Sequence, residues 1–283
     1  MGRVKAAARN IIFGYIGNLT TQLLGFVLRT IFIRHQTLNG VNALYTGILS
    51  VLSMAELGIG TALNYSLYKP VIHKDYEKIK SYMLLYKKAY RIIGFVVAGI
   101  GLVIVPFLPY LVKQPEGVTL RDLTLYYLIF LFNTVSSYFV AYKYSLVNAE
   151  QKNYIQTNII TVTKMITVTL QIIVILTTGN FYAYLLTAAT VELLQKIFVS
   201  RYLNNMYPYL KEKDIKPLTK EEVGEVVKKT KALVLHKVGD VARLQTDVMI
   251  ISGFINVTLS GIVDNYNLVI SSVSNFVNII FNS

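Results

Sequence analysis

The chain alternates long apolar runs with short polar segments, and this pattern restricts its fold more than any other feature. A helix needs roughly 20 mostly apolar residues to cross the hydrocarbon core of a bilayer. Backbone groups find no partners in lipid, so the crossing segments are expected to be helical. We therefore predict an all-α polytopic membrane bundle with eight spans: Ile11–Ile33, Ala43–Tyr68, Ile92–Val112, Leu123–Leu146, Ile155–Thr177, Phe181–Val199, Ala232–Ile255 and Leu259–Phe281.

The composition excludes several other classes. Charged residues make up 15 % of the chain, against about 25 % in a typical soluble domain. The apolar content of 54 % excludes a disordered chain, and the absence of Cys excludes a disulfide scaffold and thiol chemistry. The three His residues are widely spaced, so we predict no metal site and no cofactor. The net charge of +13 is spread between apolar runs, so we expect no nucleic-acid partner.

The distribution of Lys and Arg predicts the orientation. With the N-terminus inside, the inner segments hold 19 of these residues and the outer segments hold only Arg34, Lys113 and Arg121. Basic residues concentrate on the cytoplasmic side of membrane proteins. We therefore predict alternating spans with the N-terminus in the cytoplasm. The first run is too long for a secretory signal, and no cleavage site follows it.

We divide the chain into a six-helix N-terminal lobe (1–203), a basic cytoplasmic connector (204–231) and the start of a second transmembrane lobe (232–283). In the connector, Thr219 and Glu222 have the spacing of a helix capping box. Apolar residues follow them at helical spacing, with lysines on either side. This pattern is typical of an amphipathic helix on the inner membrane surface, either a solvated connector near anionic lipid or a docking site for a partner.

A short internal repeat supports the two-lobe division. The segment Thr37–Val41 followed by Tyr45 recurs as Thr258–Ile262 followed by Tyr266. Six spans separate the copies, so both begin on the same side of the membrane and form a parallel repeat. The first copy opens six spans and the second only two. We therefore expect a C-terminal truncation or a fragment, the alternative being a natural eight-span protein.

Ionisable residues inside a span are costly, so they are candidates for function. Arg29 lies towards the outer end of the first span, where it could instead reach the outer headgroups. Glu56 lies near the middle of the second span, where it could instead make a structural hydrogen bond. The two are possible partners if the first two helices are neighbours. Lys143 and Lys196 lie off-centre and are long enough to reach the inner interface.

The seventh span carries the densest charge. Asp240, Arg243 and Asp247 are spaced by three and four residues and so share one helix face. That face is expected to meet protein or water, either as a structural stripe of ion pairs or as the wall of a hydrated cavity. We take Arg29, Glu56, Arg243 and Asp247 as candidate substrate-binding residues of a cavity. Glu56, Asp240 and Asp247 are candidates for ion coupling.

Enzyme and motor signatures are missing from the sequence. There is no phosphate-binding loop of an ATP motor, no Asp-x-Asp pair, no His-Glu-x-x-His and no Gly-x-Ser-x-Gly. The predicted outer loops are also too short for the active site of a membrane glycosyltransferase or polymerase. We therefore expect the chain not to be an enzyme and to have no catalytic residues.

The sequence resembles the polysaccharide flippases of bacterial gene clusters, which export lipid-linked repeat units and belong to the multidrug/oligosaccharidyl-lipid/polysaccharide (MOP) superfamily. The resemblance covers essentially the whole chain. It rests on these stretches taken together: Asn10–Ile33, Ile48–Gly60, Tyr65–Pro70, Tyr86–Arg91, Asn133–Tyr138, Gln151–Tyr154, Tyr207–Leu210, Lys231–Leu233, His236–Gly239, Thr246–Asp247 and Ile250–Ser252.

The resemblance implies two six-helix lobes around a central cavity that opens alternately to each side. The cargo would be an isoprenoid-diphosphate-linked oligosaccharide, and Arg29, Glu56 and Asp247 match polar positions of the family's motifs. It also implies a bacterial cytoplasmic membrane, contact with membrane lipids, and partners among the polymerase or glycosyltransferases of the same pathway. Residues 34–38 depart from the family by lacking its usual Leu-Gly.

Three alternatives stay open on the sequence. A multidrug or cation antiporter of the same superfamily would use the acidic residues for cationic substrates, although the basic excess inside argues against it. A polytopic glycosyl- or acyltransferase would need a catalytic acid in an outer loop, where only Glu116 and Asp122 occur. A non-transporting membrane scaffold would retain its phenotype after combined replacement of Arg29 and Glu56.

Overall fold

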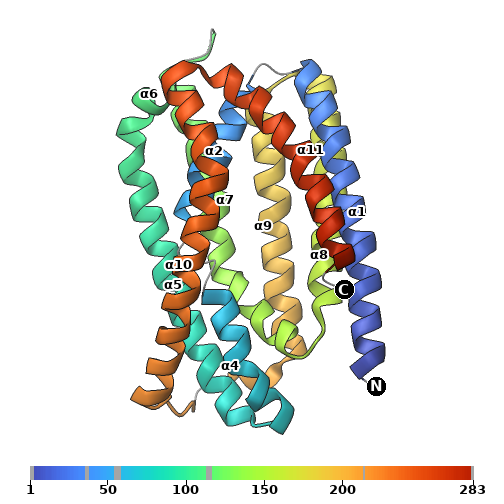
Figure 1. Ribbon diagram of the computed structural model, residues 1–283, viewed down its shortest axis with the longest axis vertical. Helices are drawn as coiled ribbons and strands as arrows, with labels where there is room; N and C mark the ends of the chain where they lie inside the picture. The colour runs from blue at the N-terminus through green and yellow to red at the C-terminus, as the bar shows by residue number, and fades with distance from the viewer. Residues whose placement is uncertain (1–2, 36–37, 54–58, 113–116, 213, 282–283) are drawn as a thin grey trace.

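The computed structural model describes residues 3–35, 38–53, 59–112, 117–212 and 214–281. All regular structure in these ranges is helical, and most helices run along the long axis of the molecule (Figure 1). The helices are α1 (Arg3–His35), α2 (Asn39–Leu52), α4 (Ile59–His73), α5 (Tyr76–Ile104), α6 (Leu108–Leu111), α7 (Leu120–Ala149), α8 (Asn153–Thr178), α9 (Phe181–Met206), α10 (Lys220–Ile250) and α11 (Val257–Phe281).

Five helices in the described residues are long and apolar enough to cross a membrane, which indicates a multi-pass membrane protein. They correspond to the first, third, fourth, fifth and sixth predicted spans. The second predicted span falls on α2 and α4, with residues 54–58 outside the described part. The seventh falls on α10 and a π-helical turn at Ile251–Ile255, and the eighth falls on α11.

Among the five spanning helices, α1, α5 and α9 pack on α7 and α8. Helix α1 lies along α8, α5 lies along α7, and α9 packs against both α7 and α8. Helices α2 and α4 pack on α7, and α10 in turn packs on α2 and α4. Helix α11 packs on α2 and slants across the view from the end of α10 towards α1 (Figure 1). Helices α10 and α11 thus cover one side of the bundle formed by the preceding helices.

Local sequence explains where several helices begin and end. Thr119 and Asp122 form a capping box at the start of α7, which satisfies backbone N–H groups that have no helical partner. Gly179 ends α8 with a φ of 60°, a left-handed conformation that costs glycine little. Helix α5 ends at Ile104 because Pro106 follows, and proline cannot occupy a helix interior without loss of a hydrogen bond.

Two apolar clusters form the core, one towards each end of the bundle. We name the ends by the predicted orientation: α2 and α11 begin at the outer end, and α5 begins at the inner end. The outer cluster is centred on Tyr45 and Tyr127, and the inner cluster on Tyr86 and Tyr138. Their hydroxyls need partners when buried. Tyr45 donates to Leu123 O at 2.9 Å and Tyr127 donates to Gly101 O at 3.0 Å.

The connector at the inner end is held against α5. Thr219 and Glu222 make both hydrogen bonds of the capping box that their spacing predicts. Glu222 also forms an ion pair with Lys78, and Glu212 forms one with Lys80 at 2.7 Å. The predicted amphipathic segment is the first part of α10, which continues without a break to Ile250.

Candidate functional site

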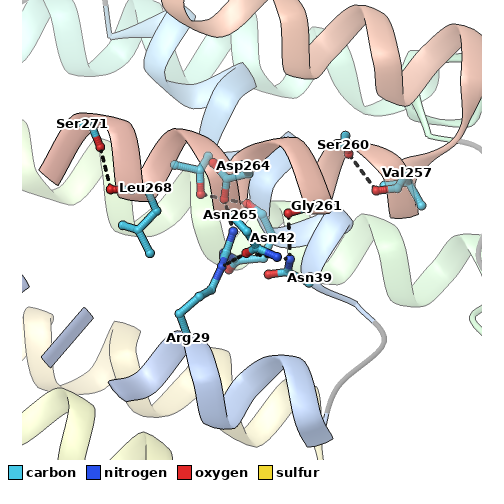
Figure 2. Close-up of polar contacts among 11 residues, drawn as sticks. Arg29, Asn39, Asn42, Val257, Ser260, Gly261, Asp264, Asn265, Leu268 and Ser271 are labelled. Carbon is cyan, nitrogen blue, oxygen red and sulfur yellow. Dashed lines mark hydrogen bonds and ion pairs between the residues drawn. The ribbon is translucent and has the colours of Figure 1, made fainter. Parts of the chain in front are cut away.

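The candidate site lies at the outer end, where α1, α2 and α11 meet (Figure 2). Helix α1 is fixed there by Leu28 and Phe32, which lie one turn apart and are buried. The ring of Phe32 packs against Phe181 and Tyr184 of α9, with centroids 5.9 and 4.9 Å away. Arg29 follows Leu28 and therefore projects from a different side of α1. Burial of its neighbours holds its backbone in place.

Arg29 joins α1 to α11 through two charged or polar contacts. Its Nη2 donates to Oδ2 of Asp264 in an ion pair, and its Nε donates to Oδ1 of Asn265 at 2.5 Å. Asn39, at the start of α2, donates to the same Asn265 oxygen at 3.4 Å. Figure 2 shows these side chains converging between the helices. The planar guanidinium suits such paired acceptors, which a lysine could not bind in the same way.

The backbones of α2 and α11 approach closely beside this ion pair. Asn39 Nδ2 donates to the carbonyl of Gly261 at 3.0 Å. A Cβ atom placed on Gly40 would lie 1.6 Å from Val257 O, and one on Gly261 would lie 2.7 Å from Gly40 N. Only glycine fits at these two positions, because any side chain would clash with backbone atoms of the other helix.

The contact joins equivalent positions of the predicted repeat. Gly40 and Gly261 occupy the same place in the two copies, and each lies in the first turns of its helix. The surroundings of the copies differ further along. Tyr45 is fully buried, whereas its counterpart Tyr266 is 68 % exposed. The starts of the two copies therefore pack on each other at one end of the bundle.

The exposure of the ion pair sets its energetic role. The side chain of Arg29 is 15 % exposed and that of Asp264 is 36 % exposed. Exposed pairs contribute at most about 1 kcal/mol, while breaking a fully buried pair costs about 3–5 kcal/mol. We expect about 1–2 kcal/mol here, between these ranges.

The other predicted site residues lie elsewhere or outside the described part. Glu56 lies in residues 54–58, so the predicted pairing of Arg29 with Glu56 is outside the described residues. Asp240 and Arg243 lie on α10, and their side chains are also outside the described part. Asp247 is exposed on the same helix. Since Arg29 contacts α11 and not Asp247, no described contact joins the predicted residues to one another.

The partners of Arg29 were not predicted as site residues. Asp264 and Asn265 lie within the predicted eighth span, and no sequence pattern marked them or Asn39 for function. One signal could have found them. The repeat places positions 40 and 261 at equivalent helix starts on the same predicted side of the membrane. Arg29 lies near the end of the helix that precedes the first copy. A carboxylate partner for it would then be expected at one of these helix starts.

A second polar cluster lies inside the first lobe, between α7 and α9. Lys196 is buried, and its Nζ donates to Asn133 O, Asn133 Oδ1 and Ser136 Oγ at 2.6–2.9 Å. Asn133 Nδ2 donates in turn to Glu192 Oε2 at 2.6 Å. The ammonium of Lys196 therefore points into the bundle and not to the inner interface. The carboxylate on the shared asparagine balances its charge.

Comparisons with protein-family models, curated proteins and solved structures return no match to this chain.

Proposed function

We propose that this chain moves an isoprenoid-diphosphate-linked oligosaccharide from the inner to the outer leaflet of a bacterial cytoplasmic membrane by alternating access. The ion pair between Arg29 and Asp264 carries the proposal, because it joins α1, which precedes the first repeat copy, to the helix that holds the second copy, at one end of the bundle. A transporter that opens alternately needs contacts of this kind, which close one end and can be broken. In this proposal the pair is the outer latch.

The chemistry of Arg29 explains how a substrate would open the latch. A diphosphate presents oxygen atoms to a guanidinium in the same geometry as a carboxylate, with more negative charge. A diphosphate that reaches the junction therefore competes with Asp264 for Arg29. Once Asp264 is displaced, α11 loses its charged contact with α1. Binding of the anionic group would thus favour separation of the helices at the outer end.

The remaining predicted residues have supporting roles in the proposal. Arg243 would attract the anionic cargo, and Glu56, Asp240 and Asp247 would shape the cavity or couple its opening to an ion. The proposed function makes no covalent bond, so the chain is not an enzyme and uses no cofactor or metal. Its partners are the lipid-linked oligosaccharide, membrane lipids and the polymerase or glycosyltransferases of the same pathway.

The test is translocation by the full chain in liposomes. The probe is a fluorescent undecaprenyl-diphosphate-linked sugar, and the readout is the fraction that a membrane-impermeant quencher reaches with time. We expect Arg29→Ala to abolish translocation. Arg29→Lys should slow it about tenfold, because lysine keeps the charge without the planar donors. Arg34→Ala is the matched control, since Arg34 is exposed at the end of the same helix.

A charge exchange separates the latch from a merely structural role. In the double variant Arg29→Asp and Asp264→Arg, the pair can form again, so the unfolding temperature should recover towards that of the wild type. Translocation should stay low, because the guanidinium now lies on the other helix. Equal translocation in Arg29→Ala and Arg34→Ala would contradict the proposal. Failure of the wild-type chain to move the probe would favour a scaffold, and uptake of a lipophilic cation would favour an antiporter.

A further inference from the structure

A cavity of about 500 Å³ opens at the inner end, away from the latch. It lies between the start of α5 and the ends of α7 and α9, and the connector closes one side. Cavities of about 300–1,000 Å³ are typical of small-molecule sites. Among the described residues, four lysines and one acidic residue line it: Lys80, Lys87, Lys143, Lys211 and Glu212. The cavity is therefore strongly positive.

Lys143 of α7 is nine-tenths buried and has no acidic partner in the described residues. Its Nζ donates to Ser200 O at 3.1 Å, Ser200 Oγ at 2.7 Å and Asn204 Oδ1 at 2.8 Å. All three acceptors are neutral. The charged side chain that acts on Lys143 electrostatically is Lys87, which is also a cation. The hydrogen bonds of Lys143 are thus satisfied, while its positive charge has no counter-charge in the described residues.

Comparison with Lys196 shows what Lys143 lacks. Both lysines are buried between α7 and α9, and both donate to three neutral oxygen atoms of the neighbouring helix. Lys196 has Glu192 one hydrogen bond away, through Asn133. Lys143 faces a cavity instead. A buried charge without a counter-charge is costly, so an anion in the cavity would supply the missing compensation.

The other cationic groups are placed to bind such an anion directly. Lys80 is neutralised by Glu77 and Glu212, so it contributes little net charge. Lys87 is half-buried and Lys211 is exposed at the mouth, and neither forms an ion pair in the described residues. Asn204 uses its oxygen on Lys143, which leaves its amide N–H groups as further donors. These groups suit phosphate oxygens, which take several charged donors at once.

We propose that this cavity binds a phosphate-bearing group, supplied either by an anionic lipid headgroup or by a soluble phosphate compound. Lys87, Lys211 and Asn204 would donate to the phosphate oxygens, and the buried Lys143 would contribute its uncompensated charge. The site is separate from the outer latch and does not depend on the proposed transport. Because the connector lines the cavity, an occupant would also hold the connector on α5.

The test measures binding to the full chain in an uncharged detergent, with two probes. Isothermal titration with glycerol 1-phosphate reports a soluble source. Native mass spectrometry in a mixture of phosphatidylcholine and phosphatidylglycerol reports retention of the anionic lipid. We expect one phosphate group per chain, and at least about tenfold weaker binding in Lys143→Met, because one charge-assisted interaction is lost. The double variant Lys87→Gln and Lys211→Gln removes the charges of the half-buried Lys87 and the exposed Lys211, and it should show the same loss.

The matched control is Lys196→Met, which removes an equally buried lysine outside the cavity and should leave binding unchanged. Binding of glycerol 1-phosphate would identify a soluble source, and retention of phosphatidylglycerol alone would identify the membrane. Two results would overturn the site: no saturable binding of either probe, or binding that the lysine variants and Lys196→Met weaken equally. Unfolding temperatures of all variants show whether each one is folded.

Discussion

Individual glycines at the outer end are predicted to control the fit of α2 on α11. In Gly40→Ala the new Cβ would lie 1.6 Å from Val257 O, so the helices must move apart. We expect a loss of about 1–3 kcal/mol in unfolding free energy, which is the usual cost of overpacking. Gly25→Ala is the control, because nothing lies within 4 Å of that position and alanine favours helix by up to about 1 kcal/mol. Thermal unfolding followed by circular dichroism compares them, and an unchanged Gly40→Ala protein would refute the close contact.

The ion pair of Glu222 with Lys78 gives a prediction about pH. The Lys78 ammonium and the backbone N–H of Thr219 lower the pKa of the Glu222 carboxyl. A carboxyl with a lower pKa in the folded chain stabilises the fold above its unfolded pKa of about 4.3, and this contribution disappears as pH falls through the folded pKa. We expect wild type to exceed Glu222→Gln in stability above about pH 5, by less than about 1 kcal/mol because both groups are partly exposed.

This stability difference should vanish as the pH falls below about 4. Unfolding temperatures measured across this range in the same detergent check it. The control is Glu221→Gln, because the adjacent Glu221 is exposed and has no ion pair in the described residues. A difference between wild type and Glu222→Gln that is constant with pH would mean that the ion pair does not form.

At the scale of helices, the sequence predicted local features well and distant partners poorly. Hydropathy located five spanning helices, because a 20-residue apolar run is a local property. Spacing located the capping box at Thr219 for the same reason. The partner of Arg29 lies 235 residues away, and no local pattern specifies it. Lys143 and Lys196 are long enough to reach the inner interface, and local sequence did not predict that oxygen atoms of the neighbouring helix accept hydrogen bonds from both ammonium groups.

The proposed latch predicts that α2 and α11 separate during transport. The facing amide atoms of Asn39 and Asn265 are 3.4 Å apart, so cysteines at these positions should react with one short bis-maleimide. The chain has no native Cys, so the reagent can react only with the introduced cysteines. We expect crosslinking to stop translocation of the lipid-linked sugar. The control joins Asp122 of α7 to Tyr182 of α9 at the same end, where the side chains also meet.

The control crosslink lies within the first lobe and should leave translocation intact. Each single-cysteine variant treated with the same reagent measures the effect of modification alone. Equal activity in the two crosslinked proteins would mean that α11 does not move away from α2, and the latch would then be a static contact.

Across the whole molecule, the last two helices are held differently at the two ends. At the outer end the attachment includes one ion pair, a few amide contacts, the glycine contact and a hydrogen bond from Ser252 to Leu111 O at 3.3 Å, and Val257 is buried in the outer core. At the inner end the connector adds two ion pairs and a hydrogen bond from Ser81 to Lys216 O at 2.5 Å, and Val226 is buried in the inner core. Under the proposed mechanism, the outer end opens while the inner attachment acts as the hinge.

The orientation of the whole bundle determines which side of the membrane the outer latch and the lysine-rich cavity face. The charge distribution predicts that Arg121 faces outward and Lys228 inward, and both are exposed. In intact cells a membrane-impermeant maleimide should label Arg121→Cys and not Lys228→Cys, and inside-out vesicles should give the reverse. The opposite result would place the lysine-rich cavity outside, away from cytoplasmic phosphate compounds. It would also place the Arg29 latch on the side where cargo enters, so that binding would open the entrance and not the exit.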